Sequence, residues 1–150
     1  MEERRAYIKK AFQMYLTHKQ QLFAWEEELK NLPIPGQSGL DYSKESVAGG
    51  GGNGVEAQFA QYADKCAELK EKIAKAQKKV DVVRRTIEHF KVESRAEGNR
   101  YYEYICARWL RRMSSYHAAA ECGIAERTAD FWIEKIFNRA EAIADEYELW

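Results

Sequence analysis

Proline is nearly absent from this sequence, which has only Pro33 and Pro35 among its 150 residues. Because proline is the strongest helix breaker, the rest of the chain is free to form long helices. A net charge is also absent, since 24 Lys and Arg residues balance 24 Asp and Glu residues. This balance argues against a simple polybasic arm, because affinity for the phosphate backbone scales with the number of basic contacts.

Long hydrophobic runs and closely spaced cysteines are absent too. No apolar run approaches the roughly 18 residues of a transmembrane helix, and residues 1–5 lack the apolar core of a signal peptide. The three cysteines, Cys66, Cys106 and Cys122, have no C-x-x-C spacing and fall in helical patterns. They predict reduced, partly buried thiols. We therefore expect a soluble, cytoplasmic protein with no membrane partner.

The charges that do occur are unevenly distributed along the chain. Residues 62–95 carry ten Lys or Arg residues against six Asp or Glu residues, and residues 96–139 carry seven against six. Residues 140–150 carry four acidic residues and no basic one. A neutral chain thus contains a basic middle and an acidic tail, which predicts modest non-specific affinity for nucleic acid.

The N-terminal part predicts a long helix followed by a linker. Apolar residues at spacings of three and four indicate a helix over about residues 2–31, which Pro33 and Pro35 end. Residues 33–54 contain a glycine-rich run at 49–54, which favours a flexible linker. A phosphate-binding P-loop is disfavoured, because the lysine and hydroxyl that should follow the glycines are missing and no strand pattern precedes them.

A second helix is predicted over about residues 55–91. Its apolar positions alternate spacings of three and four without a slip, which is typical of a coiled-coil seam. These positions are Phe59, Tyr62, Cys66, Leu69, Ile73, Ala76, Val80, Val83, Ile87 and Phe90. The seam needs a partner, which is the first helix folded back, the same helix of a second subunit, or both. Because the first helix is shorter, we expect a homodimer or larger oligomer through residues 55–91.

The C-terminal part predicts three shorter helices. The dipeptide Gly98-Asn99 breaks the pattern, and helices follow at about residues 100–112, 115–122 and 126–147. No stretch alternates long enough to predict a strand. The sequence therefore predicts an all-α fold. A long helical hairpin or coiled coil covers residues 1–97, and a three-helix helix-turn-helix module covers residues 98–150.

The stretch from Ser115 to Ile136 has the features that a helix-turn-helix needs. Small residues at Ala118–Ala120 allow a second helix to cross closely, and Gly123 supplies a turn residue tolerant of positive φ. Ile124 then fills the core. The second helix is expected to bury one row of side chains and to expose the other side. The buried row consists of Ala129, Trp132 or Ile133, Ile136, Ala140 and Ile143.

The exposed side of this second helix supplies the candidate contacts to DNA bases. In the major groove, Arg127 is the best candidate for guanine, and Phe131 for a thymine methyl group. Thr128 is assigned to a thymine methyl or a phosphate. Glu126 is expected either to accept a hydrogen bond from cytosine N4 or to interact favourably with the positive N-terminal end of its own helix. Lys135 lies further along the same side, where Asp130 and Glu134 oppose DNA binding.

Residues before the turn supply the candidate contacts to phosphates. Ser114, Ser115 and Tyr116 open the first helix of the pair, where hydroxyl and backbone N–H groups commonly hold phosphate. Arg111 and Arg112 lie just upstream, with Arg108, and are expected to neutralise phosphates.

These motifs resemble those of known DNA-binding proteins. The portion from Asn99-Arg100-Tyr101-Tyr102 through Gly123-Ile124-Ala125-Glu126-Arg127-Thr128 is similar to the DNA-binding C-terminal region of sigma factors. The layout resembles phage-encoded transcription regulators of the RinA and ArpU type. In those proteins two N-terminal helices flank a glycine-rich excursion, and an Arg-Tyr…Ile…Arg-Trp-Leu helix precedes the helix-turn-helix. The resemblance implies activation of prophage late or packaging genes. Ala125 departs from the serine or threonine that usually caps the recognition helix.

The sequence thus predicts a double-stranded DNA-binding regulator of phage transcription and not an enzyme. A small-terminase-like packaging subunit and a helical adaptor without a nucleic-acid role are the alternatives. No cofactor, catalytic group or metal site is expected, because the three histidines are far apart and lack ligand-like spacing. Residues 147–150 are candidates for docking on RNA polymerase or for closing the helical core.

Overall fold

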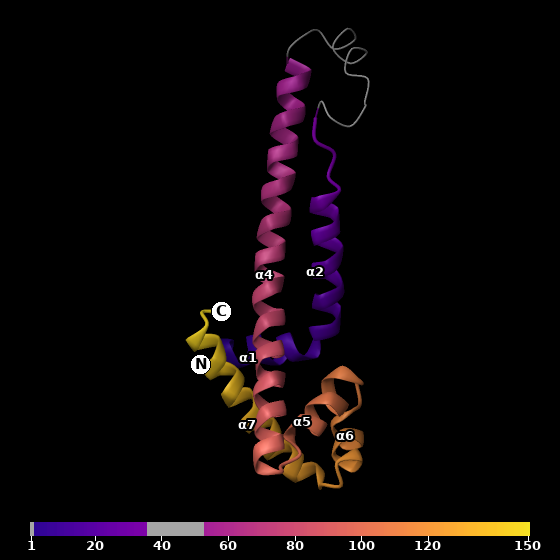
Figure 1. Cartoon of the computed structure of the whole chain (residues 1–150), viewed down its shortest axis with the longest axis vertical. Coiled ribbons are helices and arrows are strands. Elements are labelled where there is room, and N and C mark those ends of the chain that lie inside the picture. Colours follow the sequence, from indigo (N-terminus) through magenta and orange to yellow (C-terminus); the bar gives the residue numbers. More distant parts are fainter. Residues whose placement is uncertain (1, 36–52) are drawn as a thin grey trace. The chain divides into compact units, whose positions relative to one another are not determined.

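The structure is a computed structural model that describes residues 2–35 and 53–150. Every element formed by these residues is helical, so the predicted all-α class is confirmed. None of the described helices combines the length and apolarity needed to cross a membrane. The chain forms two compact units (Figure 1). The larger unit joins Met1–Gln20 to Ala76–Trp150, and the smaller unit is Gln21–Lys75.

The N-terminal helix is broken, and the prediction of one helix over residues 2–31 is wrong at this point. Helix α1 spans Glu2–Gln13 and helix α2 spans Tyr15–Lys30. Figure 1 shows α1 meeting the start of α2 at a sharp corner. Backbone bonds continue through the corner, from Met14 N to Lys10 O (2.9 Å) and from His18 N to Met14 O (2.7 Å). Packing explains the break, because α1 turns aside to lie against helix α7 (Glu126–Glu146) of the same unit.

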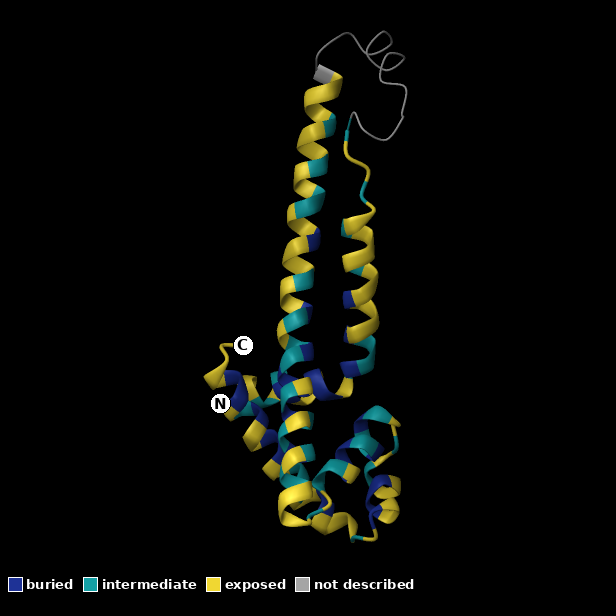
Figure 2. Ribbon diagram, in the orientation of Figure 1, coloured by how far each residue is buried: buried dark blue, intermediate teal, exposed yellow. Residues whose placement is uncertain are grey.

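Helix α4 spans Asn53–Glu97 and extends the predicted helix at both ends. Figure 2 shows buried and intermediate residues recurring along α4. In the predicted seam, the row of Tyr62, Leu69, Ala76, Val83 and Phe90 is buried more fully than the row of Phe59, Cys66, Ile73, Val80 and Ile87. Leu69, Val83 and Phe90 are at most 1% exposed, whereas Phe59 is 48% exposed. In the predicted linker, Asn53 and Gly54 already belong to α4. Its glycine-rich part, up to residue 52, lies outside the described residues.

Gly98 and Asn99 end α4 as the sequence predicts. Gly98 has φ +73°, and its N–H donates to Ser94 O at 2.9 Å. The Ser94 hydroxyl donates to Asn99 Oδ1 at 2.7 Å, and the Tyr101 N–H reaches the same oxygen at 3.4 Å. The left-handed glycine therefore closes one helix, while the Asn99 side chain accepts from the first N–H of the next.

The predicted helix over residues 100–112 has two parts. Tyr101–Ile105 forms α5, and Cys106–Leu110 forms the π-helix η1, in which Arg111 N bonds Cys106 O at 2.9 Å, five residues back. Helix α6 spans Ser115–Glu121 and α7 spans Glu126–Glu146, each ending within one residue of the prediction. The bounds of α6 and α7 therefore follow from short-range signals in the sequence: the turn, the caps and the apolar rows.

Aromatic rings from distant parts of the sequence form the core of the larger unit. Phe12 of α1 lies 4.9 Å from Trp109 and 5.3 Å from Phe137, between ring centroids. Arg5 of α1 pairs with Glu134 of α7 at 2.8 Å and with Glu141. Helix α7 is therefore held by the N-terminal helix as well as by α6.

The last residues of the chain pack onto the same unit. Leu149 is 8% exposed, and its carbonyl accepts a hydrogen bond from the Tyr7 hydroxyl at 2.9 Å. Trp150 Nε1 donates to Asp145 at 2.7 Å, and its ring lies 5.5 Å from that of Tyr7. These contacts favour the core-closing interpretation of residues 147–150.

Candidate nucleic-acid interface

A tight turn joins α6 to α7. Ala118 and Ala119 are buried at 0% and 2% exposure, so they let the two helices approach closely. The Gly123 N–H donates to Ala120 O and the Ile124 N–H to Ala119 O, both at 3.0 Å. Gly123 has φ +68°, which is the left-handed conformation that the sequence predicts for this residue. The backbone of this turn is thus fixed by hydrogen bonds and by one glycine.

The Arg100 side chain stabilises the C-terminal end of α6 by a hydrogen bond, a role that the sequence did not predict. Its Nη1 donates to the carbonyl of Cys122 at 2.6 Å, and its Nε donates to Glu103 at 2.8 Å. The guanidinium therefore satisfies a carbonyl that the last turn of the helix leaves free. Burial raises the pKa of the neighbouring Cys122 thiol, which favours its neutral form.

The buried face of α7 matches the predicted row. Ala129, Ile136, Ala140 and Ile143 are all buried, and Phe137 and Ala144 join them. Trp132 is half-buried, with its ring 4.8 Å from that of Tyr101. This apolar face orients the helix, so the opposite face is presented to solvent.

Arg127 and Phe131, four residues apart, lie on that opposite face with Thr128 at its edge, whereas Glu126, three residues before the buried Ala129, lies beside the buried row. Glu126, Arg127 and Thr128 occupy the first turn of α7, and all three are exposed. Phe131 follows one turn later and is 68% exposed. Within the described part of the chain, the Arg127 side chain forms no ion pair or hydrogen bond, so its guanidinium is available to a partner.

Lys135 is exposed as predicted but has a contact of its own. Its Nζ lies 4.8 Å above the centre of the Tyr101 ring, a distance typical of cation–π interactions. Reaching a phosphate would require it to leave this ring. Lys135 is therefore a weaker candidate than Arg127.

Most of the predicted phosphate-contacting residues are engaged within the fold. Arg111 pairs with Glu121 at 3.6 Å, and the Arg112 Nη2 group donates to Thr17 Oγ1 at 3.3 Å. The Ser114 hydroxyl accepts from the His117 N–H at 3.1 Å and so caps α6. Ser115 is half-buried.

Tyr116 is the most open of the predicted phosphate-contacting group. It is 65% exposed, with its ring 5.6 Å from that of His117. Its hydroxyl is therefore accessible to a phosphate without loss of a core contact.

The acidic residues on α7 weigh less against DNA than the sequence alone suggests. Glu134 pairs with Arg5 at 2.8 Å, so α1 neutralises its charge. Asp130 is exposed beside Phe131 and keeps an acidic group near the candidate contacts. A carboxylate in this place would repel a nearby phosphate.

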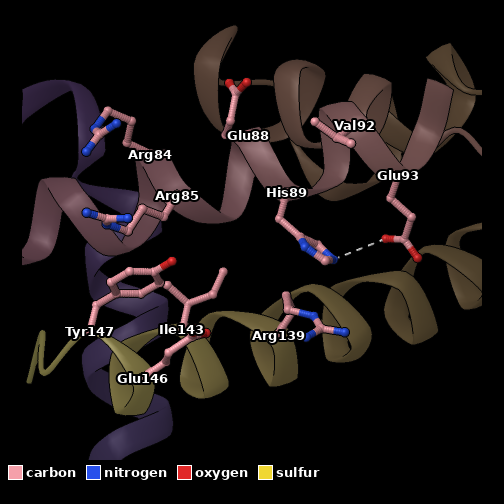
Figure 3. Close-up of a pocket in the computed structure, with 10 residues that line it drawn as sticks. All are labelled: Arg84, Arg85, Glu88, His89, Val92, Glu93, Arg139, Ile143, Glu146 and Tyr147. Carbon is pink, nitrogen blue, oxygen red and sulfur yellow. Dashed lines mark ion pairs between the residues drawn. The ribbon is translucent and has the colours of Figure 1, made fainter. Parts of the chain in front are cut away.

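A separate cleft of about 580 Å³ lies between α4 and α7 in the larger unit (Figure 3). Arg85 stacks 3.9 Å above the Tyr147 ring, and His89 pairs with Glu93 at 3.5 Å. Three arginines and three glutamates line the cleft, so neither sign of charge dominates. The Arg85–Tyr147 contact joins α4 to the residue just after α7, whereas the His89–Glu93 pair lies within α4. The cleft lacks the basic character of a nucleic-acid site.

Comparison with protein-family models, with curated proteins and with solved structures found no match to this chain.

Proposed function

We propose that this protein is a sequence-specific double-stranded DNA-binding regulator of phage or prophage transcription. In this proposal α6 and α7 form a helix-turn-helix, and α7 is the recognition helix in the major groove. The observation that carries the proposal is the exposed, unpaired Arg127 one turn before the 68% exposed Phe131, on a helix whose other face is anchored in the core.

The exposed residues divide into those that read bases and those that hold the backbone. Arg127 donates two hydrogen bonds to O6 and N7 of guanine, and Phe131 packs against a thymine methyl group. Thr128 and Tyr116 contact phosphates beside them. Arg111 and Arg112 neutralise nearby phosphates while keeping their contacts to Glu121 and Thr17.

The charge balance of the chain sets how the affinity should depend on salt. With few free cations near α7, few counterions are released on binding, so the salt dependence is shallow. Specific contacts must then supply most of the difference between the cognate site and random DNA. The assignment to phage late genes, and to RNA polymerase as a further partner, is supported by the resemblance of the sequence layout alone.

Fluorescence anisotropy tests the proposal, with the purified protein on labelled upstream DNA of its own operon and on a scrambled duplex over a salt series. A regulator is expected to prefer its site by roughly a thousandfold or more. Arg127→Ala should cost about 1–3 kcal/mol on the specific duplex and relax the preference at one base pair. Arg95→Ala, an exposed arginine of α4, is the matched control and should bind like the wild type.

The other outcomes point to the alternative functions. Equal, weak binding to both duplexes would favour a packaging subunit over a regulator. Absence of binding at low salt would exclude the DNA-binding function and leave the helical adaptor.

A further inference from the structure

In the smaller unit, helix α4 has one face packed against α2. Lys65 of α4 pairs with Glu28 of α2 at 3.6 Å, and the Lys72 ammonium lies 5.9 Å from the centre of the Trp25 ring. Leu69, on the same side of the helix, is 1% exposed. These contacts define the side of α4 that its own chain covers.

The other side of α4 is apolar as well, and the other described residues leave most of it uncovered. At about 100° per residue, three adjacent rows of side chains lie there. We call them the open face: Glu56, Ala63 and Lys70 in the central row, Phe59 and Cys66 on one flank, and Ala60 and Ala67 on the other. Phe59 is 48% exposed, Cys66 is half-buried and the three alanines are exposed. Small side chains at the centre of a helix face allow a second helix to approach closely.

Two unpaired charges of opposite sign mark the ends of the open face. Glu56 and Lys70 are exposed, and neither forms an ion pair within the described residues. Neighbouring charges on α4 do pair along the helix, as Glu68 does with Lys72 at 3.2 Å. Glu56 and Lys70 each lie seven residues from Ala63, so they stand about 10.5 Å on either side of it along the axis.

We propose that the open face binds a second copy of this chain, with the two α4 helices antiparallel and the two-fold axis beside Ala63. Such an axis brings each row against the same row of the other copy with its direction reversed. Glu56 then meets Lys70 of the partner subunit, and Lys70 meets the partner's Glu56. On the flanks, Phe59 packs on the partner's Cys66 and Ala60 on the partner's Ala67.

The charges select this direction over the parallel one. A parallel pair would place Glu56 against the partner's Glu56 and Lys70 against the partner's Lys70, and both contacts are repulsive. The proposal also differs from a simple coiled coil through the predicted seam, because α2 covers the Leu69 side of that seam within one chain. It stands independently of DNA binding.

Analytical ultracentrifugation of the full chain over a wide range of concentration tests the association. We expect a reversible dimer for the wild type. Glu56→Lys and Lys70→Glu should each give monomers. In a dimer of either variant, positions 56 and 70 carry the same charge, so like charges would face each other at both ends of the interface. An equimolar mixture of the two variants should form a heterodimer, since both ion pairs are then restored. Asp64→Lys lies about 100° around the helix from Ala63 and is the matched control that should still dimerise.

Disulfide trapping tests the register. In a chain carrying Cys106→Ser and Cys122→Ser, Phe59→Cys should allow a bond to Cys66 of the partner subunit under mild oxidation. The two positions are about 10.5 Å apart along one helix, too far for a bond within one chain. A monomer at every concentration, or a mixture of the charge variants that stays monomeric, would overturn the proposal. Bonds only between the two copies of Cys66 would overturn the antiparallel register. Circular dichroism checks that every variant stays helical.

Discussion

The ring of Phe12 lies 4.9 Å from the ring of Trp109, tilted by 59°. This contact joins the N-terminal helix to the segment just before α6, and Phe137 of α7 completes the cluster. Helix α7, the proposed recognition helix, therefore shares a core with α1.

Replacing Phe12 should destabilise the larger unit strongly. Phe12 is fully buried, so Phe12→Ala leaves a cavity and is expected to lower the free energy of unfolding by about 3–5 kcal/mol. Urea titration followed by circular dichroism measures this. Phe131→Ala makes the same chemical change at a 68% exposed position of the same unit and should cost less than about 0.5 kcal/mol. Equal losses for the two variants would show that α1 does not pack as described.

Gly123 should tolerate asparagine better than alanine. A Cβ at this position would meet only Arg100 Nη1 at 3.7 Å, an ordinary contact, so the constraint is the φ of +68° and not space. Gly123→Ala is expected to cost about 1–2 kcal/mol of stability, and Gly123→Asn less, because asparagine visits this conformation more readily. Thermal unfolding compares the two. Gly54→Ala, in open space within α4, should cause no loss. If both Gly123 variants unfold like the wild type, the turn does not depend on the left-handed residue.

Phe131 should act in DNA binding through thymine methyl groups. On the cognate duplex, Phe131→Ala is expected to lose roughly 1 kcal/mol, about the value of burying one methyl group. Deoxyuridine in place of thymidine removes the methyl groups from the DNA, so the wild type should weaken by a similar amount. The variant should then bind both duplexes alike in anisotropy titrations. A full additional loss for the variant on the uridine duplex would contradict a methyl contact.

His18 should make stability depend on pH. It is 5% exposed, and burial lowers its pKa below the ordinary value of 6.5, with further lowering by the charges of Lys79 and Lys10. The unfolded chain therefore binds a proton that the folded chain resists, so the free energy of unfolding falls as the pH drops below about 6.5.

Urea titrations at pH 7.5 and pH 5.5 measure this dependence. His18→Gln should flatten it, because the titrating group is gone. An unchanged dependence would assign it to other groups.

Where the sequence predicts the ends of a helix well, the residues that determine those ends lie within a few positions of them. Gly98 and Asn99 stop one helix and start the next through contacts a few residues apart. The apolar row of α7 is likewise a short-range pattern, and its predicted members Ala129, Ile136, Ala140 and Ile143 are buried.

The features that the sequence did not reveal depend on distant residues. The corner at Met14 contains neither proline nor glycine and arises because α1 packs on α7. The sequence predicts that Glu134 opposes DNA binding, but Arg5, 129 positions away, pairs with it and neutralises its charge. Arg112, expected to be free for phosphate, donates to Thr17 from a backbone with φ +55°. Such long-range pairs produce no periodic pattern in the sequence, so they are seen only in the structure.

The packing of α1 on α7 also affects the order in which the parts of the chain fold during synthesis. Arg5 and Glu141 are 136 positions apart, so the first helix emerges from synthesis long before its partner exists. Contacts of such long sequence separation form late and slow folding. Until α7 is complete, the apolar side of α1 stays uncovered, and the chain has a window of vulnerability to aggregation and proteolysis.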